Sequence, residues 1–389
     1  MSERLTALEL IALIRRVFRP GPDDVRLAIL VDLPDAAVPD RPEWRERRRM
    51  AAEWVSQLRA QREALGMDVS LILYRNVAMN NADLPPEVWP GAPEALPESA
   101  EALDPAAAVP LEQMLATHSV LIAPTQFSAT APLKLLGRTH RFRAATMPGF
   151  TAEMIPALRL DYGEVRRRVA IMKDLLDRSS RATLRFEVDG RDVHTLVLDL
   201  RHRRAHASDG IIETPGTAGN LPSGEAYIVP YEGEVPGVPS DSAGTLPVQF
   251  GADVVLYRIE ANRAVAVSGQ GPAAAEQAAL LAAEPAYGNL AELGLGVLAD
   301  LGVQPTGEIL LDEKLGLHIA FGRSDHFGGQ VGAAQFSRPE AVVHIDRIYL
   351  PGLQPRIVPR AVDLLDEAGR ATALMRDGAY VRGLLQPRA

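Results

Sequence analysis

The chain has no cysteine among its 389 residues, and only 5% of them are aromatic. Without thiols it can form no disulfide, no thiolate nucleophile and no cysteine-ligated zinc or iron–sulfur site, so any metal ion must be held by His, Asp or Glu. Basic residues are in the minority, since 41 Lys and Arg stand against 50 Asp and Glu and give a formal net charge of −9. An acidic chain with few rings for stacking is a poor nucleic-acid binder, and we expect no nucleic-acid partner.

The sequence also lacks long apolar runs. No stretch approaches the roughly 18 consecutive apolar residues of a membrane-spanning helix, and the start, MSERLTALEL, holds no long apolar segment. We therefore expect a cytoplasmic protein without a membrane partner. Hydrophobic residues make up 47% of the chain, which suffices for sizeable cores, and its length allows two or more domains.

The first half of the chain alternates between expected strands and helices. Four apolar segments predict strands, at 25–34, 68–75, 119–125 and 140–150. The amphipathic segment 41–66 predicts a long helix, and the proline-rich segment 81–105 is expected to be a surface loop. Such alternation is typical of a largely parallel α/β sheet. No glycine-rich phosphate loop follows the first strand, so no dinucleotide cofactor is expected.

The pattern changes beyond an expected helix at 161–181. Two alternating segments flank DGRD (189–192) and predict a hairpin, and short strands and a helix at 271–285 follow. We therefore predict an α/β protein with an N-terminal α/β sheet domain at residues 1–181. A C-terminal α+β domain at residues 182–389 is expected to carry the functional site.

A histidine and an aspartate share one face of an expected strand near the C-terminus. In AVVHIDRIYL (341–350), His344 and Asp346 are two residues apart, so their side chains point the same way. Two such side chains are suited to binding one metal ion or to bridging to a second one. A simple hydrogen bond between them on a solvated face explains the pair equally well.

Charged residues interrupt an apolar stretch at LLDEKLGLHIAFG (310–322). Glu313 and His318 are five residues apart, so they reach one site only if the chain turns between them, and Gly316 permits such a turn. A buried Glu313 requires a cation. Lys314 and a metal ion are the two candidates.

Two further glutamates lie in glycine-rich, apolar surroundings. Glu292 occurs in YGNLAELGLG (287–296), and Glu225 precedes an expected strand in GNLPSGEAYIVP (219–230). Each alone is explained as a turn or helix-start residue. Four separate segments that each place a carboxylate or an imidazole in such a frame indicate a metal site.

In this order, the segments NLPSGEAYIVP, GNLAELGLG, DEKLGLHIAFG, FGG and VHID resemble the motif series of the aminopeptidase T/aminopeptidase S family of metallo-aminopeptidases, which are leucyl aminopeptidase-like. The resemblance implies a dinuclear divalent-metal site in the C-terminal domain. It carries over to six ligand positions, namely Glu225, Glu292, Glu313, His318, His344 and Asp346. Carboxylates and imidazoles suit two ions of Zn, Co or Mn. Either Glu292 or Glu313 is expected to bridge the ions or to move a proton.

One departure from the family concerns a tyrosine. The family's peptidases carry it a few residues after the histidine of the third motif, where its hydroxyl can stabilise a tetrahedral intermediate. Here that segment reads GRSDHFGG (322–329) and has no tyrosine. His326 is either the substitute donor or a polar loop residue.

The alternative is a mononuclear Fe(II) dioxygenase. The motif series is also related to that of ring-cleaving 2,5-dihydroxypyridine dioxygenases, and His318, His344 and Asp346 would supply a triad of two histidines and one carboxylate. The dioxygenase motifs differ from this chain at two positions: they have a histidine at the position of Glu292 and no matching glutamate at the position of Glu225. A non-enzymatic relative is the third possibility. We expect an enzyme that acts on a peptide or small molecule and forms a homodimer.

Overall fold

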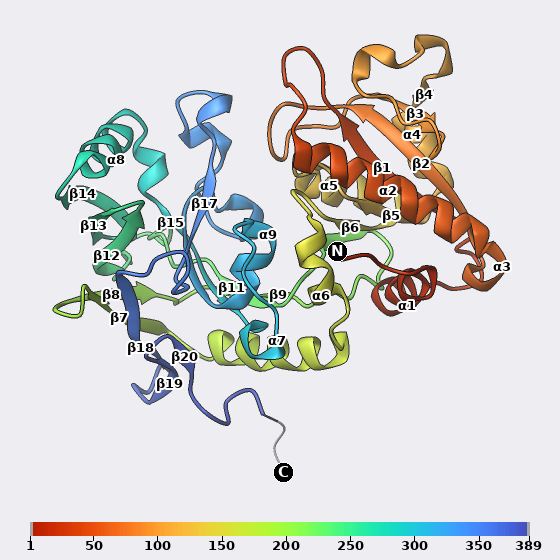
Figure 1. Cartoon of the computed structure of the whole chain (residues 1–389). Helices are drawn as coiled ribbons and strands as arrows, with labels where there is room; N and C mark the ends of the chain where they lie inside the picture. The colour runs from red at the N-terminus through yellow and green to blue at the C-terminus, as the bar shows by residue number, and fades with distance from the viewer. Residues whose placement is uncertain (1–2, 387–389) are drawn as a thin grey trace. The chain divides into compact units, whose positions relative to one another are not determined.

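The computed structural model describes residues 3–386 and contains two compact units (Figure 1). The N-terminal unit runs up to Arg166 and takes in a later segment, Ser208–Ser223. The C-terminal unit consists of Arg167–Ala207 and the chain from Gly224 onward. The single domain boundary predicted at residue 181 does not account for the later segment that returns to the N-terminal unit. This boundary stays a prediction.

A mixed, mainly parallel seven-stranded sheet forms the centre of the N-terminal unit. Its order is β10-β6-β5-β1-β2-β3-β4, and β1, β2, β5, β6 and β10 pair in parallel. The bounds are β1 (Arg26–Leu33), β2 (Asp68–Arg75), β3 (Glu87–Gly91), β4 (Val109–Pro110), β5 (Val120–Ala123), β6 (Arg143–Thr146) and β10 (Thr217–Asn220). Seven of the eight residues of β1 are buried, as expected of a parallel strand covered on both faces.

Helices cover this sheet. α2 packs on β1 and β2, and α5 packs on β6 and β10 (Figure 1). The helices of the unit are α1 (Ala7–Phe18), α2 (Pro42–Ala60), α3 (Arg62–Leu65), α4 (Leu111–Thr117), α5 (Thr130–His140) and α6 (Ile155–Leu158). The α/β fold class predicted from the alternation is confirmed.

The predicted loop at 81–105 is wrong in one part, because it contains strand β3. Val88 and Trp89 are buried, and the indole Nε1 of Trp89 donates a hydrogen bond to the carbonyl of Asp104 at 2.8 Å. These two apolar side chains hold the proline-rich segment against the sheet.

The C-terminal unit contains two antiparallel sheets. The larger sheet has the order β14-β13-β12-β8-β7-β18-β19-β20, and the smaller has the order β17-β16-β15-β11-β9, in which β9 is His206–Ser208. The larger sheet comprises β7 (Arg181–Val188), β8 (Asp192–Asp199), β12 (Ala243–Phe250), β13 (Asp253–Glu260), β14 (Arg263–Gly269), β18 (Ile357–Leu365), β19 (Ala371–Arg376) and β20 (Ala379–Tyr380). The predicted hairpin is confirmed, because β7 and β8 pair along their whole length around Asp189 and Gly190.

Helices α7 (Tyr162–Asp177), α8 (Pro272–Ala283) and α9 (Ile309–Asp312) complete the fold. The chain passes from the first unit to the second within α7. α8 packs on β13 and β14. Within the described part of the chain, no helix combines the length and the apolar character that crossing a membrane requires.

The first prediction concerns Asp32, which lies near the end of β1 and is fully buried. Its carboxylate accepts hydrogen bonds from the backbone N–H groups of Gln126 and Phe127 and from the indole of Trp44, at 2.8 to 3.0 Å. Asp32→Ala leaves these donors without their acceptor, so we expect the free energy of unfolding to fall by about 3 kcal/mol in urea titrations. The exposed Asp23→Ala is the control, and an equal effect of both changes would contradict this role.

Candidate metal centre

Four neighbouring strands of the smaller sheet bring five of the six predicted ligands to one face. The strands are β11 (Glu225–Ile228), β15 (Leu290–Gly296), β16 (Leu317–Gly322) and β17 (His344–Ile348). In the register, Gly296 lies opposite Glu225 and Gly294 opposite His318. Ala320 lies opposite both Glu292 and Asp346, and Gly322 lies opposite His344. Paired residues share a face, and so do residues two apart, so Glu225, Glu292, His318, His344 and Asp346 all point the same way.

Small residues separate these side chains and leave room for them. A Cβ atom on Gly294 would lie 1.8 Å from Nε2 of His318, so the imidazole occupies the space above β15 that the glycine leaves free. A Cβ atom on Gly296 would lie 2.2 Å from the backbone carbonyl carbon of Lys314. The glycines noted in the sequence are therefore required by the close approach of other parts of the site.

Glu313 reaches the same site from outside the sheet. It begins a short 3-10 helix (Glu313–Leu315) directly after α9, and β16 starts at Leu317 after an extended Gly316. The chain thus turns between Glu313 and His318, as their spacing requires. Lys314 contacts Oε1 of Glu313, so it supplies one of the two cationic partners considered for this glutamate.

The six side chains form two groups of three. Within each group, one donor atom from every residue lies within 4.8 Å of the others: Glu225, Glu313 and His318 make the first group, and Glu292, His344 and Asp346 the second. Glu292 connects the groups, because its Oε1 lies 3.2 Å from Nε2 of His318 and its Oε2 lies 3.4 Å from Nε2 of His344. All six predicted positions therefore meet at one place, while metal ligation itself stays a prediction.

The donor chemistry fits cations. Oε2 of Glu225 and Oδ1 of Asp346 are buried and make no hydrogen bond within the described chain. A buried carboxylate oxygen without a hydrogen-bond donor is costly, and a positive ion would remove that cost. Nδ1 of His344 lies 2.8 Å from the backbone carbonyl of Arg323, which can only accept a hydrogen. This contact places a ring hydrogen on Nδ1 and directs Nε2 toward the carboxylates, the orientation of a metal-binding histidine.

Burial and mutual charge shift the pKa values of these groups. Burial raises the pKa of Glu313 to about 8, against the opposing charge of Lys314. Burial alone would lower the pKa of His318, but its contact with Glu292 and the nearby carboxylate charges raise the pKa to about 9. A bound cation requires both groups to lose their protons, so metal binding is expected to release protons.

A wall of aromatic rings borders the site, and the sequence analysis missed most of it. Tyr227 lies two residues after Glu225 on β11 and therefore shares its face. Its ring stacks on His206 at 5.2 Å and meets Phe327 edge-on at 4.8 Å. Burial, and then the charges of Glu292, Glu225 and Glu313, raise the pKa of Tyr227 well above its usual value. Tyr227 thus presents a protonated hydroxyl close to the carboxylates.

His326 lies beside this wall and belongs to neither group of three. Its ring centre is 5.4 Å from that of His344 and 3.8 Å from that of Phe327. Burial lowers the pKa of His326 to about 4, so its ring is neutral at pH 7. The structure therefore places His326 next to a predicted ligand, and a catalytic role for it stays a prediction.

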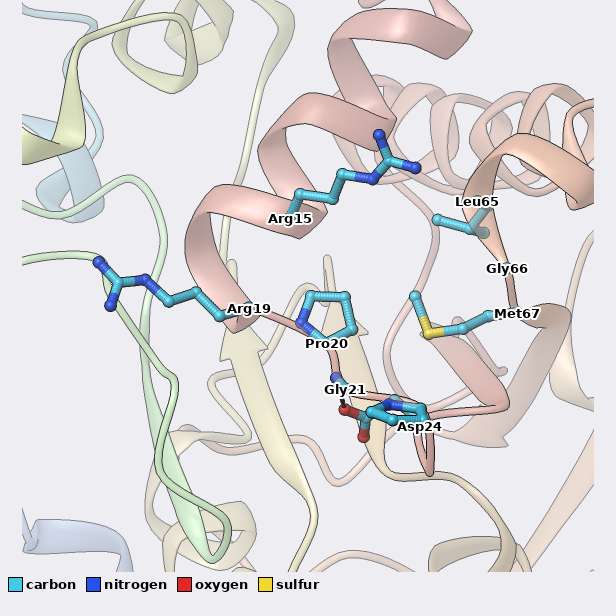
Figure 2. Close-up of a pocket in the computed structure, with 9 residues that line it drawn as sticks. Arg15, Arg19, Pro20, Gly21, Asp24, Leu65, Gly66 and Met67 are labelled. Atoms are coloured by element: carbon cyan, nitrogen blue, oxygen red, sulfur yellow. Dashed lines mark hydrogen bonds between the residues drawn. The ribbon is translucent and has the colours of Figure 1, made fainter.

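A separate hollow of about 550 Å³ lies in the N-terminal unit and is shown in Figure 2. Its two arginines extend in different directions from α1, and both are engaged: Arg19 pairs with Glu213 at 2.7 Å, and Arg15 donates a hydrogen bond to the carbonyl of Ala64 at 2.5 Å. They do not converge on a common anion position. None of the predicted site residues lines this hollow.

Two solved structures resemble the chain over nearly its whole length. A 2,5-dihydroxypyridine dioxygenase from Pseudomonas putida KT2440 matches with a TM-score of 0.61 and 14% identity, covering 98% of this chain and 100% of that one. Wild-type AmpT, an aminopeptidase T from Thermus thermophilus, matches with a TM-score of 0.52 and 18% identity, covering 96% and 99%. No protein-family model and no curated protein matches the chain. At these identities the likenesses show a shared fold.

The second prediction concerns Gly294. In Gly294→Ala the added methyl group collides with the His318 imidazole, so we expect the free energy of unfolding to fall by about 2 kcal/mol. The matched control is Gly352→Ala, because a Cβ atom there meets nothing within 4 Å and the change should cost less than about 0.5 kcal/mol. Chemical denaturation of both variants provides the measurement. Similar stabilities would contradict the close packing of His318 over β15.

Proposed function

We propose that the chain is a metal-dependent hydrolase of aminopeptidase type that cleaves an amide bond of a peptide or small molecule. One observation carries this proposal: two three-residue groups of carboxylate and imidazole donors meet at one face of a sheet and are connected through Glu292. The distant likeness to an aminopeptidase T is consistent with it. A homodimeric state and a cytoplasmic location remain predictions.

The donor set selects the class of metal. Four carboxylates and two imidazoles, with no thiolate, suit Zn, Co or Mn. When bound, a divalent ion would lower the pKa of a water molecule and polarise the scissile carbonyl.

The side chains of Glu292 and Glu313 are suited to two different roles in this reaction. Each carboxylate oxygen of Glu292 faces one of the two histidines, so Glu292 is suited to holding the groups together. Glu313 is better suited to moving a proton from water to the leaving amine, because its raised pKa of about 8 lies near neutral pH. We therefore assign the holding role to Glu292 and the proton transfer to Glu313.

The Tyr227 hydroxyl is the proposed substitute for the family's tyrosine. Its ring packs against Phe327, within the same GRSDHFGG segment that lacks a tyrosine. A hydroxyl supplied from β11 would thus stand beside the carboxylates and donate a hydrogen bond to the developing oxyanion. The aromatic rings of Phe327 and His206 hold that hydroxyl in place.

The second candidate function is a mononuclear Fe(II) dioxygenase. It is favoured by the TM-score of 0.61 to the 2,5-dihydroxypyridine dioxygenase. Against it, His318 belongs to one group of three, while His344 and Asp346 belong to the other. The carboxylate of Glu292 lies between the two histidines, where the resemblance gives the dioxygenases a histidine.

The third prediction tests the metal and the reaction together. Purified protein loaded with Zn²⁺, Co²⁺ or Mn²⁺ should hydrolyse aminoacyl amides, and chelation should abolish the activity reversibly. Glu292→Gln should lower kcat/KM at least about 100-fold, because it weakens the connection between the two groups. The matched control is Glu276→Gln on the exposed side of α8, which should retain full activity.

The outcomes of this assay separate the candidates. Folded protein that binds no metal would overturn the proposed centre. Binding of Fe(II) together with oxygen consumption on a dihydroxypyridine would favour the dioxygenase instead. Metal binding without hydrolysis of any aminoacyl amide would count against the aminopeptidase type.

The fourth prediction concerns the hydroxyl of Tyr227. Tyr227→Phe should lower kcat roughly 100-fold with little change in KM, because the donor acts on charge that develops in the transition state. Its thermal stability should be unchanged, since the ring contacts to His206 and Phe327 remain. The control is Tyr257→Phe, whose hydroxyl bonds to Gln277 and lies outside the two groups. A kcat equal to that of the unmodified enzyme would exclude the proposed role.

A further inference from the structure

We infer that the Lys314 ammonium permanently occupies one of the two cation positions, so that the centre binds a single metal ion, at Glu292, His344 and Asp346. This inference rests on the proposed metal centre and changes its stoichiometry. Its basis is the contact between Lys314 and Glu225, two residues that are distant in the sequence.

The ammonium lies inside the first group of three. Its Nζ lies 2.5 Å from Oε1 of Glu225 and also contacts Oε1 of Glu313. These two carboxylates, with His318, are the donors of that group. An ammonium and a metal ion compete for the same oxygen lone pairs, so the two Oε1 atoms that contact Nζ are not free to bind an ion, while Oε2 of Glu225 faces Nε2 of His318 at 3.5 Å.

Lys314 is held firmly in this position. Its side chain has 0% exposure, and its carbonyl accepts a hydrogen bond from the backbone N–H of Leu298 at 2.9 Å. The backbone at Lys314 packs so closely against Gly296 that a Cβ atom there would collide with it. Moving the ammonium away would therefore require a buried charge to find a new partner.

A second ion beside this ammonium would also be repelled. Two cations a few ångströms apart in a buried site interact strongly, because the effective dielectric constant is low there. Among the 41 basic residues of the chain only three are lysines, at 134, 173 and 314. One of these three thus occupies the centre of the carboxylate cluster.

The second group differs from the first because, among the described residues, Lys314 contacts Glu225 and Glu313 but none of its members. Nε2 of His344 lies 3.4 Å from Oε2 of Glu292 and 3.7 Å from Oδ1 of Asp346. Oδ1 of Asp346 is buried and has no hydrogen-bond donor in the described chain, and Nδ1 of His344 is fixed by the carbonyl of Arg323. In the described residues Asp346 forms its ion pair with His344, so no lysine or arginine supplies the second group with the charge that Lys314 supplies to the first.

The fifth prediction is a metal count. The unmodified protein, dialysed against excess Mn²⁺ or Zn²⁺, should retain one ion per chain by elemental analysis. Lys314→Met removes the ammonium and keeps the side-chain length, so it should retain two ions. Lys173→Met is the matched control, because this exposed lysine pairs only with Asp177 on α7, and it should retain one ion.

Electron paramagnetic resonance of the Mn²⁺ form gives a second readout. The unmodified protein should show the spectrum of an isolated ion, and Lys314→Met should show a spin-coupled pair, since ions in two-metal sites lie about 3.5–4 Å apart. If Lys314→Met does not fold, the metal count and the spectrum of the unmodified protein still show whether it binds one ion or two.

Each possible result of the metal count and the spectrum tests a different part of the inference. Two coupled ions in the unmodified protein would overturn the inference and leave the proposed hydrolase intact. A single ion in both the unmodified protein and Lys314→Met would show that Lys314 does not exclude the second ion. No ion in any folded variant would overturn the metal centre itself.

Discussion

Four carboxylates, from Glu225, Glu292, Glu313 and Asp346, are gathered on one side of a small antiparallel sheet and largely removed from water. Like charges at such short range repel one another, and burial increases the cost. Much of the local structure offsets this repulsion: Lys314 contacts two of the carboxylates, and the two histidines lie between the remaining ones. The raised pKa of His318 expresses the same imbalance, because this imidazole keeps a proton that it would lose in water at neutral pH.

The sheet also has to provide enough volume for the charged side chains of the site. Glutamate and histidine side chains on adjacent strands compete for the same volume unless small residues stand between them. Gly294 and Gly296 on β15 and Ala320 on β16 provide this volume opposite the functional side chains. The consequence is a site built on strands, with one predicted ligand, Glu313, supplied by a turn. Strand-borne ligands have little freedom to adjust, so the register between strands determines the geometry of the donors.

Local patterns in the sequence predicted those parts of the site that depend on neighbouring residues. The two-residue spacing of His344 and Asp346 placed them on one face, and Gly316 allowed the turn that joins Glu313 to His318. Contacts between distant segments were beyond such reasoning. Lys314 reaches Glu225 across 89 positions of sequence, and Tyr227 joins the site only through the pairing of β11 with β15. The return of Ser208–Ser223 to the first unit likewise depends on the pairing of β10 with β6, and no local sequence pattern predicts this pairing.

The charge beside the ligands, rather than the ligands alone, determines how many ions such a centre can hold. All six donor positions are present, and by their identity they suit two ions. Yet the residue that follows Glu313 along the chain brings a fixed positive charge to the first group, and this charge meets the same carboxylate oxygens that an ion would use. A complete set of donors is therefore compatible with a single ion. In a one-ion hydrolase, the activation of water depends on the Glu292, His344 and Asp346 group, and Lys314 serves to keep Glu225 and Glu313 together in the wall of the site.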